Sequence, residues 1–245
     1  NGSEVFSTSS IEDKFTANLI LDADISNDGR YLVMMKAGRI EVFDLVARSK
    51  VATERALNMS AVAVGPDNKT LVYARRNGEI AIYNIASQKV LSKHDLGRLT
   101  PNRLAWSDSG RYIAVGTRGN IVLLFDVETK EIHRTARLEA NWVWDIEFSD
   151  DSNYLGVAMK SGDVRLIETA GGEVIRAWKA HEGAVYALTF HPSGRYMATG
   201  GADRQVRVWE LPEGKAVKSW QAHDDQVFAL DFSPDGTMLA SGCNN

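Results

Sequence analysis

The stretch VYALTFHPSGRYMATG at residues 185–200 decides the fold of this chain. Residues 185–190 are rich in β-branched and aromatic side chains, a composition typical of a strand. Pro192 and Gly194 favour a turn, because proline presets φ and glycine tolerates a positive φ. A second strand is expected at residues 196–200, so the stretch predicts a β-hairpin.

Two further strands follow. Between Gln205 and Trp209, Val206 and Val208 alternate with polar residues, and residues 216–220 read as a fourth strand. Four short strands joined by tight turns make an antiparallel sheet, because these lengths leave no room for the helix that a parallel crossover needs.

The same unit recurs along the chain. The residue three places after each turn aspartate, or its equivalent, is found at steps of 39 residues and then 42: Tyr31, Thr70, Tyr112, Tyr154, Tyr196 and Met238. A period of about 40–45 residues is that of a four-stranded propeller blade. The chain is therefore expected to be all-β, with its function on a surface assembled from repeats.

Several short motifs carry a family resemblance. AH at 180–181, FHPSG at 190–194, ATGGAD at 198–203 and VWE at 208–210 resemble a WD repeat, and the next repeat has AH at 222–223, FSPDG at 232–236 and LASG at 239–242. The resemblance extends, more weakly, over the rest of the chain. It implies a β-propeller of four-stranded antiparallel blades.

The two ends of the chain read as one repeat. The chain stops two strands into a repeat, and Phe6 lies where the residue 42 places after Trp209 would fall in a closed ring. We expect a single domain, 1–245, with six blades, in which residues 1–17 complete the blade of residues 220–245. Closure would hide the sheet edges. The alternative is a piece of a longer propeller.

One set of polar residues has a structural role in WD repeats: His181, Thr199, Asp203 and Trp209. The resemblance implies a buried hydrogen-bond chain among them. A histidine, a carboxylate and a hydroxyl also suggest a nucleophilic triad. The structural interpretation is favoured, because a threonine within a strand has no exposed turn on which to present its hydroxyl. No catalytic residue is expected.

Cations recur just before the turn aspartate position in the first four repeats: Lys36, Arg76, Arg118 and Lys160. In WD propellers this position lies on the face where the inner strands begin. The inner strands add aromatic residues there: Trp142, Trp144, Tyr186 and Phe228. Cations beside aromatic side chains predict a binding surface. The alternative is that Lys and Arg are ordinary surface residues.

Composition and residue spacing argue against several classes of site and partner. The net charge of −4 argues against nucleic acid. Cys243 is the single cysteine, so no internal disulfide can form and a cytoplasmic location is expected. The apolar runs are strand-sized, so no membrane span is expected. The five histidines have no metal-site spacing, and no glycine-rich phosphate loop suggests a cofactor. Three acids at matching inner-strand positions could line a channel or bind a cation, although solvated or paired acids are the favoured interpretation: Asp24, Glu147 and Asp231.

The sequence thus predicts a non-catalytic scaffold that docks a protein or peptide, acidic or phosphorylated, on a basic and aromatic face. Arginine bonds to carboxylate or phosphate would supply the recognition. Three alternatives stay open: a regulatory or sensor segment of a larger multidomain protein, a propeller enzyme with a site in the central channel, and a nucleic-acid-binding module.

Overall fold

The computed structural model describes residues 19–119, 121–134, 138 and 142–243. All regular secondary structure in these ranges is β-strand, and the strands pair in antiparallel fashion. The chain divides into two compact units, Asn1–Trp106 and Ser107–Asn245. Among the described residues there is no helix long and apolar enough to cross a bilayer. The prediction of an all-β fold built from four-stranded antiparallel sheets is confirmed.

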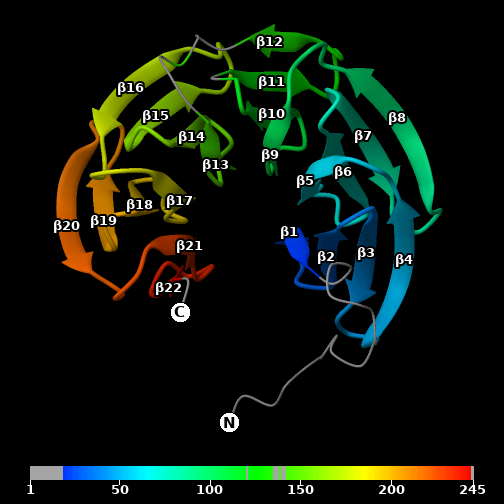
Figure 1. Ribbon diagram of the computed structural model, residues 1–245, viewed down its shortest axis with the longest axis horizontal. Helices are drawn as coiled ribbons and strands as arrows, with labels where there is room; N and C mark the ends of the chain where they lie inside the picture. Colours follow the sequence, from blue (N-terminus) through cyan, green and yellow to red (C-terminus); the bar gives the residue numbers. More distant parts are fainter. Residues whose placement is uncertain (1–18, 120, 135–137, 139–141, 244–245) are drawn as a thin grey trace. The chain divides into compact units, whose positions relative to one another are not determined.

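Unit 1 contains two complete sheets, in which the strands follow one another in chain order (Figure 1). The first consists of β1 (Ile20–Ile25), β2 (Tyr31–Lys36), β3 (Arg39–Asp44) and β4 (Ser49–Arg55). The second consists of β5 (Met59–Val64), β6 (Thr70–Arg75), β7 (Glu79–Asn84) and β8 (Lys89–Asp95). Strand β9 (Pro101–Trp106) packs against β5 and β6.

Unit 2 repeats this architecture. It begins with β10 (Tyr112–Thr117), β11 (Val122–Asp126) and β12 (Ile132–Arg134). Two complete sheets follow: β13 (Val143–Phe148), β14 (Tyr154–Met159), β15 (Asp163–Glu168) and β16 (Val174–Lys179), then β17 (Val185–Phe190), β18 (Tyr196–Gly201), β19 (Gln205–Glu210) and β20 (Lys215–Gln221). Within the described residues the last sheet has two strands, β21 (Val227–Phe232) and β22 (Leu239–Cys243).

The predicted hairpin at 185–200 is the β17–β18 pair. Phe190 opposes Met197 in the register, and the turn between them contains Gly194 with a φ of 68°. This left-handed backbone conformation costs glycine nothing, because glycine has no Cβ. The equivalent turn before β14 has Ser152 in the same conformation, with a φ of 59°.

Neighbouring sheets of unit 2 approach closely. Strand β17 packs against β13 and β14 on one side and β21 on the other. A Cβ atom on Gly156 of β14 would lie 3.0 Å from a methyl group of Leu188 and 3.1 Å from the ring of Phe190. Both side chains are buried in the core between the sheets. Burial of each contributes about 1.5–3 kcal/mol to stability, so glycine at 156 allows the close packing that provides it.

Carboxylates join the first strands of these neighbouring sheets. Asp145 Oδ2 accepts a hydrogen bond from the backbone N–H of Leu188 at 3.0 Å. Glu147 Oε1 accepts from the N–H of Phe190 at 3.0 Å and from the hydroxyl of Thr189 at 3.2 Å. Burial raises the pKa of Glu147 well above its usual value, despite these hydrogen bonds.

Unit 1 has the same arrangement between β1 and β5. Asp22 Oδ2 accepts from the N–H of Val62 at 3.0 Å, and Asp24 Oδ2 accepts from the N–H of Val64 at 2.7 Å. Burial raises the pKa of Asp24 to about 6. Asp24 and Glu147 therefore bind backbone donors of the next sheet. The third matching acid, Asp231 of β21, has its pKa raised by burial as well.

The predicted closing strands in residues 1–17 lie outside the described residues. The six-bladed ring closed by 1–17 with 220–245, and the single domain of 1–245, stay predictions.

Candidate functional site

The four residues of the expected hydrogen-bond chain lie together in the β17–β20 sheet. His181 Nδ1 lies 2.8 Å from Asp203 Oδ1, and its Nε2 lies 2.7 Å from Thr199 Oγ1. Trp209 Nε1 donates to the same hydroxyl at 2.8 Å. Because the indole N–H can only donate, the threonine hydroxyl accepts this hydrogen bond. The imidazole of His181 therefore links the carboxylate of Asp203 to the hydroxyl that Trp209 also binds.

Burial disfavours the charged form of this imidazole. His181 and Thr199 are both buried, and burial lowers the pKa of the histidine although Asp203 opposes the shift. Arg207, which sequence reasoning missed, donates to Asp203 Oδ2 at 2.7 Å and to the carbonyl of Ala180 at 2.9 Å. Its position in β19, two residues before Trp209, could have indicated that it belongs to the network, because residues two apart in a strand lie on the same face. The arrangement holds a loop, a turn and two strands together, and Thr199 is not exposed.

The four predicted aromatic residues form one row in unit 2, hereafter the aromatic row. Trp142 and Trp144 have ring centroids 6.2 Å apart, Trp144 and Tyr186 are edge-to-face at 5.3 Å, and Tyr186 stacks on Phe228 at 4.4 Å. They come from the starts of β13, β17 and β21. Trp142 and Phe228, at the two ends, are 38% and 43% exposed, which is unusual for such large apolar groups.

Two of the predicted cations lie at one end of the aromatic row. Arg118 follows β10 and Lys160 follows β14, and each places its charge 5.0 Å from the ring centroid of Trp142. Such cation–π contacts are worth about 0.5–1 kcal/mol at exposed sites. One indole ring therefore holds two like charges near each other. Lys160 is exposed and Arg118 is partly exposed.

The other two cations belong to unit 1. Arg76 is exposed, directly after β6. Lys36 is only 5% exposed, with its ammonium 2.8 Å from Glu41 Oε2. The prediction of Lys36 as a cation on an exposed face is therefore wrong. Burial opposes ionisation of Glu41, but bonds from Lys36 and Lys50 lower its pKa, so Lys36 serves as an internal counterion.

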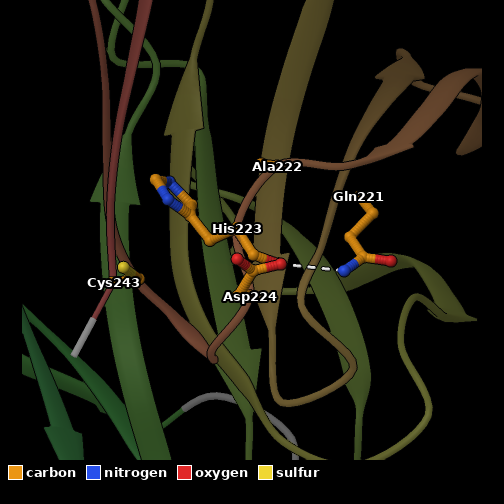
Figure 2. A pocket seen from close by; sticks show the side chains of 5 residues that line it. All are labelled: Gln221, Ala222, His223, Asp224 and Cys243. Carbon is orange, nitrogen blue, oxygen red and sulfur yellow. Dashed lines mark hydrogen bonds between the residues drawn. The ribbon is translucent and has the colours of Figure 1, made fainter. Parts of the chain in front are cut away.

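A hollow of about 400 Å³ lies beside the last sheet (Figure 2). Four of its five lining residues carry polar or ionisable side chains or a thiol: Gln221, Ala222, His223, Asp224 and Cys243, of which Ala222 is the exception. Gln221 Nε2 donates to the carbonyl of His223 at 3.2 Å. The imidazole Nε2 of His223 lies 2.8 Å from the hydroxyl of Ser241, as expected for a repeat that keeps part of the hydrogen-bond chain. No group of three or more potential ligands is arranged for a metal ion in the described part of the chain.

Comparisons with known proteins agree with the repeat pattern. Residues 172–210 and 214–245 match the family model described as WD domain, G-beta repeat. Residues 68–170 match the model described as eukaryotic translation initiation factor eIF2A. A search of curated proteins found no match. The resemblance to WD-repeat propellers is confirmed. WD40 repeats in general form non-catalytic scaffolds for protein interaction.

Proposed function

We propose that this WD-repeat chain is a non-catalytic scaffold that docks an acidic or phosphorylated protein segment on the aromatic row. Arg118 and Lys160 would bind the anionic group, while Trp144, Tyr186 and Phe228 would receive apolar side chains beside it. No catalytic step and no cofactor are part of this proposal, and a cytoplasmic location stays a prediction.

The placement of two cations over Trp142 carries the proposal. Two positive charges beside one ring suit a phosphate monoester, which carries a charge of about −1.5 to −2 at neutral pH. Arginine can bind phosphate or carboxylate oxygens through two parallel N–H groups, and lysine adds a point charge. The indole edge and the neighbouring rings supply apolar area, which is where binding energy concentrates at interfaces.

The charges at the other end of the row favour a protein segment over a nucleic acid. Glu182 precedes β17, and Asp224 and Asp225 precede β21, at the same strand ends as Tyr186 and Phe228. A nucleic acid with a phosphate at every nucleotide would meet these carboxylates. A peptide with one local acidic group would not. The polarity of the surface therefore supports a peptide that is negative at the Trp142 end.

The match of residues 68–170 to the eIF2A model supports a more specific second candidate, a role in translation initiation. The matched region contains Arg118 and Lys160 and crosses the boundary between the two units. In that case the docked segment would belong to a protein of translation initiation.

The test uses a peptide array in which each sequence is present with serine, glutamate or phosphoserine at its centre. The full chain should bind glutamate and phosphoserine versions above the serine versions, and more weakly as salt rises. The double variant Arg118→Glu with Lys160→Glu should lose this preference, because it reverses the local charge. Trp144→Ala should instead speed dissociation from the peptides that remain bound.

Thermal unfolding provides the control for this experiment. Exposed charges contribute little to folding, so the double variant should melt within a few degrees of the natural chain. An unchanged array pattern in a correctly folded double variant would contradict the proposed docking surface.

A further inference from the structure

A trio of side chains recurs in three sheets, at the start of the second strand and the end of the third. An arginine lies over the tyrosine that follows it and pairs with an acid at the end of the third strand. The three trios are Arg30–Tyr31–Asp44, Arg111–Tyr112–Asp126 and Arg195–Tyr196–Glu210. In this order, the guanidinium carbon lies 5.1, 5.0 and 5.3 Å from the centroid of the tyrosine ring. A guanidinium nitrogen lies 2.9, 2.9 and 2.8 Å from the carboxylate oxygen.

The β13–β16 sheet has the tyrosine and the acid of this trio but not the arginine. Tyr154 opposes Glu168 in the register, as the tyrosine and acid do in the three complete trios. The arginine position is held by Asn153, whose amide donates to Asp151 at 2.8 Å. In the described part of the chain, no cation lies over Tyr154 and no ion pair engages Glu168, which is exposed.

A hollow of about 390 Å³ occupies this place. Its lining includes Tyr154 and Glu168 from one sheet, together with Tyr112 at the start of β10 and Arg111 just before it. Arg111 is already neutralised by Asp126 at 2.9 Å, so it does not prevent a second cation from entering. A guanidinium group is much smaller than this hollow, which leaves room for the methylene chain that carries it.

A threonine that lines the same hollow has a buried hydroxyl without a partner among the described residues. Thr169, which directly follows Glu168, is 3% exposed, and its Oγ1 finds no hydrogen-bond partner among the described residues. The corresponding positions in the other repeats are apolar: Leu45, Ile85, Val127 and Leu211. A polar atom left unsatisfied in a protein interior costs about 1–3 kcal/mol. The repeat that has the tyrosine and the acid without the arginine is thus the one with an additional buried acceptor.

We propose that this hollow binds the guanidinium group of an arginine side chain from a partner protein. The incoming group takes the place of the missing arginine, stacks on Tyr154 and donates to Glu168, with Thr169 Oγ1 as a further acceptor. Arginine fits better than lysine, because its planar group both stacks on an aromatic ring and donates in a fixed fork. This inference does not depend on the aromatic row.

The experiment titrates the full chain with the peptide acetyl-Gly-Arg-Gly-amide and follows the ring signals of ¹³C-labelled tyrosine by NMR. The Tyr154 signals should shift with arginine, less with the lysine peptide, and not with the citrulline peptide, which has the same shape without charge. Glu168→Gln should weaken binding by about tenfold, the usual effect of losing a charge-assisted hydrogen bond.

Asn153→Arg should abolish the shift by filling the hollow from within, and it should retain or slightly raise the thermal stability. Glu210→Gln is the matched control, because it removes the acid of a complete trio and should leave the Tyr154 response unchanged. The proposal is overturned if Tyr154 does not respond to the arginine peptide, or if its response survives in the folded Asn153→Arg variant.

Discussion

The β13–β16 and β17–β20 sheets have the same topology but use polar side chains in opposite ways. In β17–β20, His181, Thr199 and Trp209 bind one another inside the sheet. In β13–β16 the positions of the threonine and tryptophan hold Val157 and Ile167, both fully buried. A repeat fixed by an internal polar network has few polar groups left for partners. A repeat held by apolar packing can place its polar groups at binding surfaces.

The strongest test of this comparison is His181→Ala. The substitution removes the partner of both Thr199 and Asp203, so the free energy of unfolding should fall by about 3 kcal/mol. Chemical denaturation measures the loss. His94→Ala is the control, because His94 is partly exposed, lies outside the network and has its Nε2 3.2 Å from the hydroxyl of Ser92. Equal losses at the two sites would remove the case for a network of structural importance.

A smaller effect is expected when the threonine is transferred to the other sheet. Val157→Thr places a hydroxyl where β14 is completely buried and where Ile167 stands in the position of the tryptophan. The free energy of unfolding should fall by about 1–2 kcal/mol, the cost of an unpartnered hydroxyl. Denaturant titration of this variant beside Thr199→Val tests the comparison directly. A neutral Val157→Thr would show that the β13–β16 sheet tolerates polarity as well as its neighbour does.

The weakest expected effect concerns Glu147, which connects the two sheets. Burial raises its pKa in the folded chain above the usual 4.5, so the folded state keeps a proton that the unfolded state has released. The free energy of unfolding should therefore fall as pH rises above about 4.5. Asp145 and Asp231 add to the shift by repulsion.

Glu147→Gln removes this titration, and urea denaturation across pH 4–7 should show a shallower decline of stability than in the natural chain. A steeper or unchanged decline would contradict the assignment of the proton to Glu147.

Local patterns predicted much of the fold. Alternation and turn residues located strands such as Val185–Phe190 to within a residue, because backbone geometry follows from neighbours in sequence. Repeat spacing likewise brought out the aromatic residues that meet across β13, β17 and β21. Lys36 was misplaced, because its counterion Glu41 lies across a hairpin and spacing does not reveal which face a long side chain takes.

The hydrogen bonds from carboxylates to the neighbouring sheet could not be predicted from the sequence either. Spacing showed that Asp24 and Glu147 are equivalent, but their partners are backbone N–H groups of another repeat, and every residue except proline offers such a donor. The empty place beside Tyr154 could have been noticed from Asn153 at an arginine position, provided that the trio itself was known.

The paired bonds from Asp145 and Glu147 have a mechanical consequence. A single hydrogen bond between two sheets would allow them to pivot about it. Two hydrogen bonds along the same pair of strands, β13 and β17, oppose both sliding and pivoting. Trp144 and Tyr186 lie just beyond these attachments and keep their 5.3 Å separation without help from a ligand. A partner on the proposed docking surface would then meet rings that are already in position, and association would lose less entropy than in ordering a mobile surface.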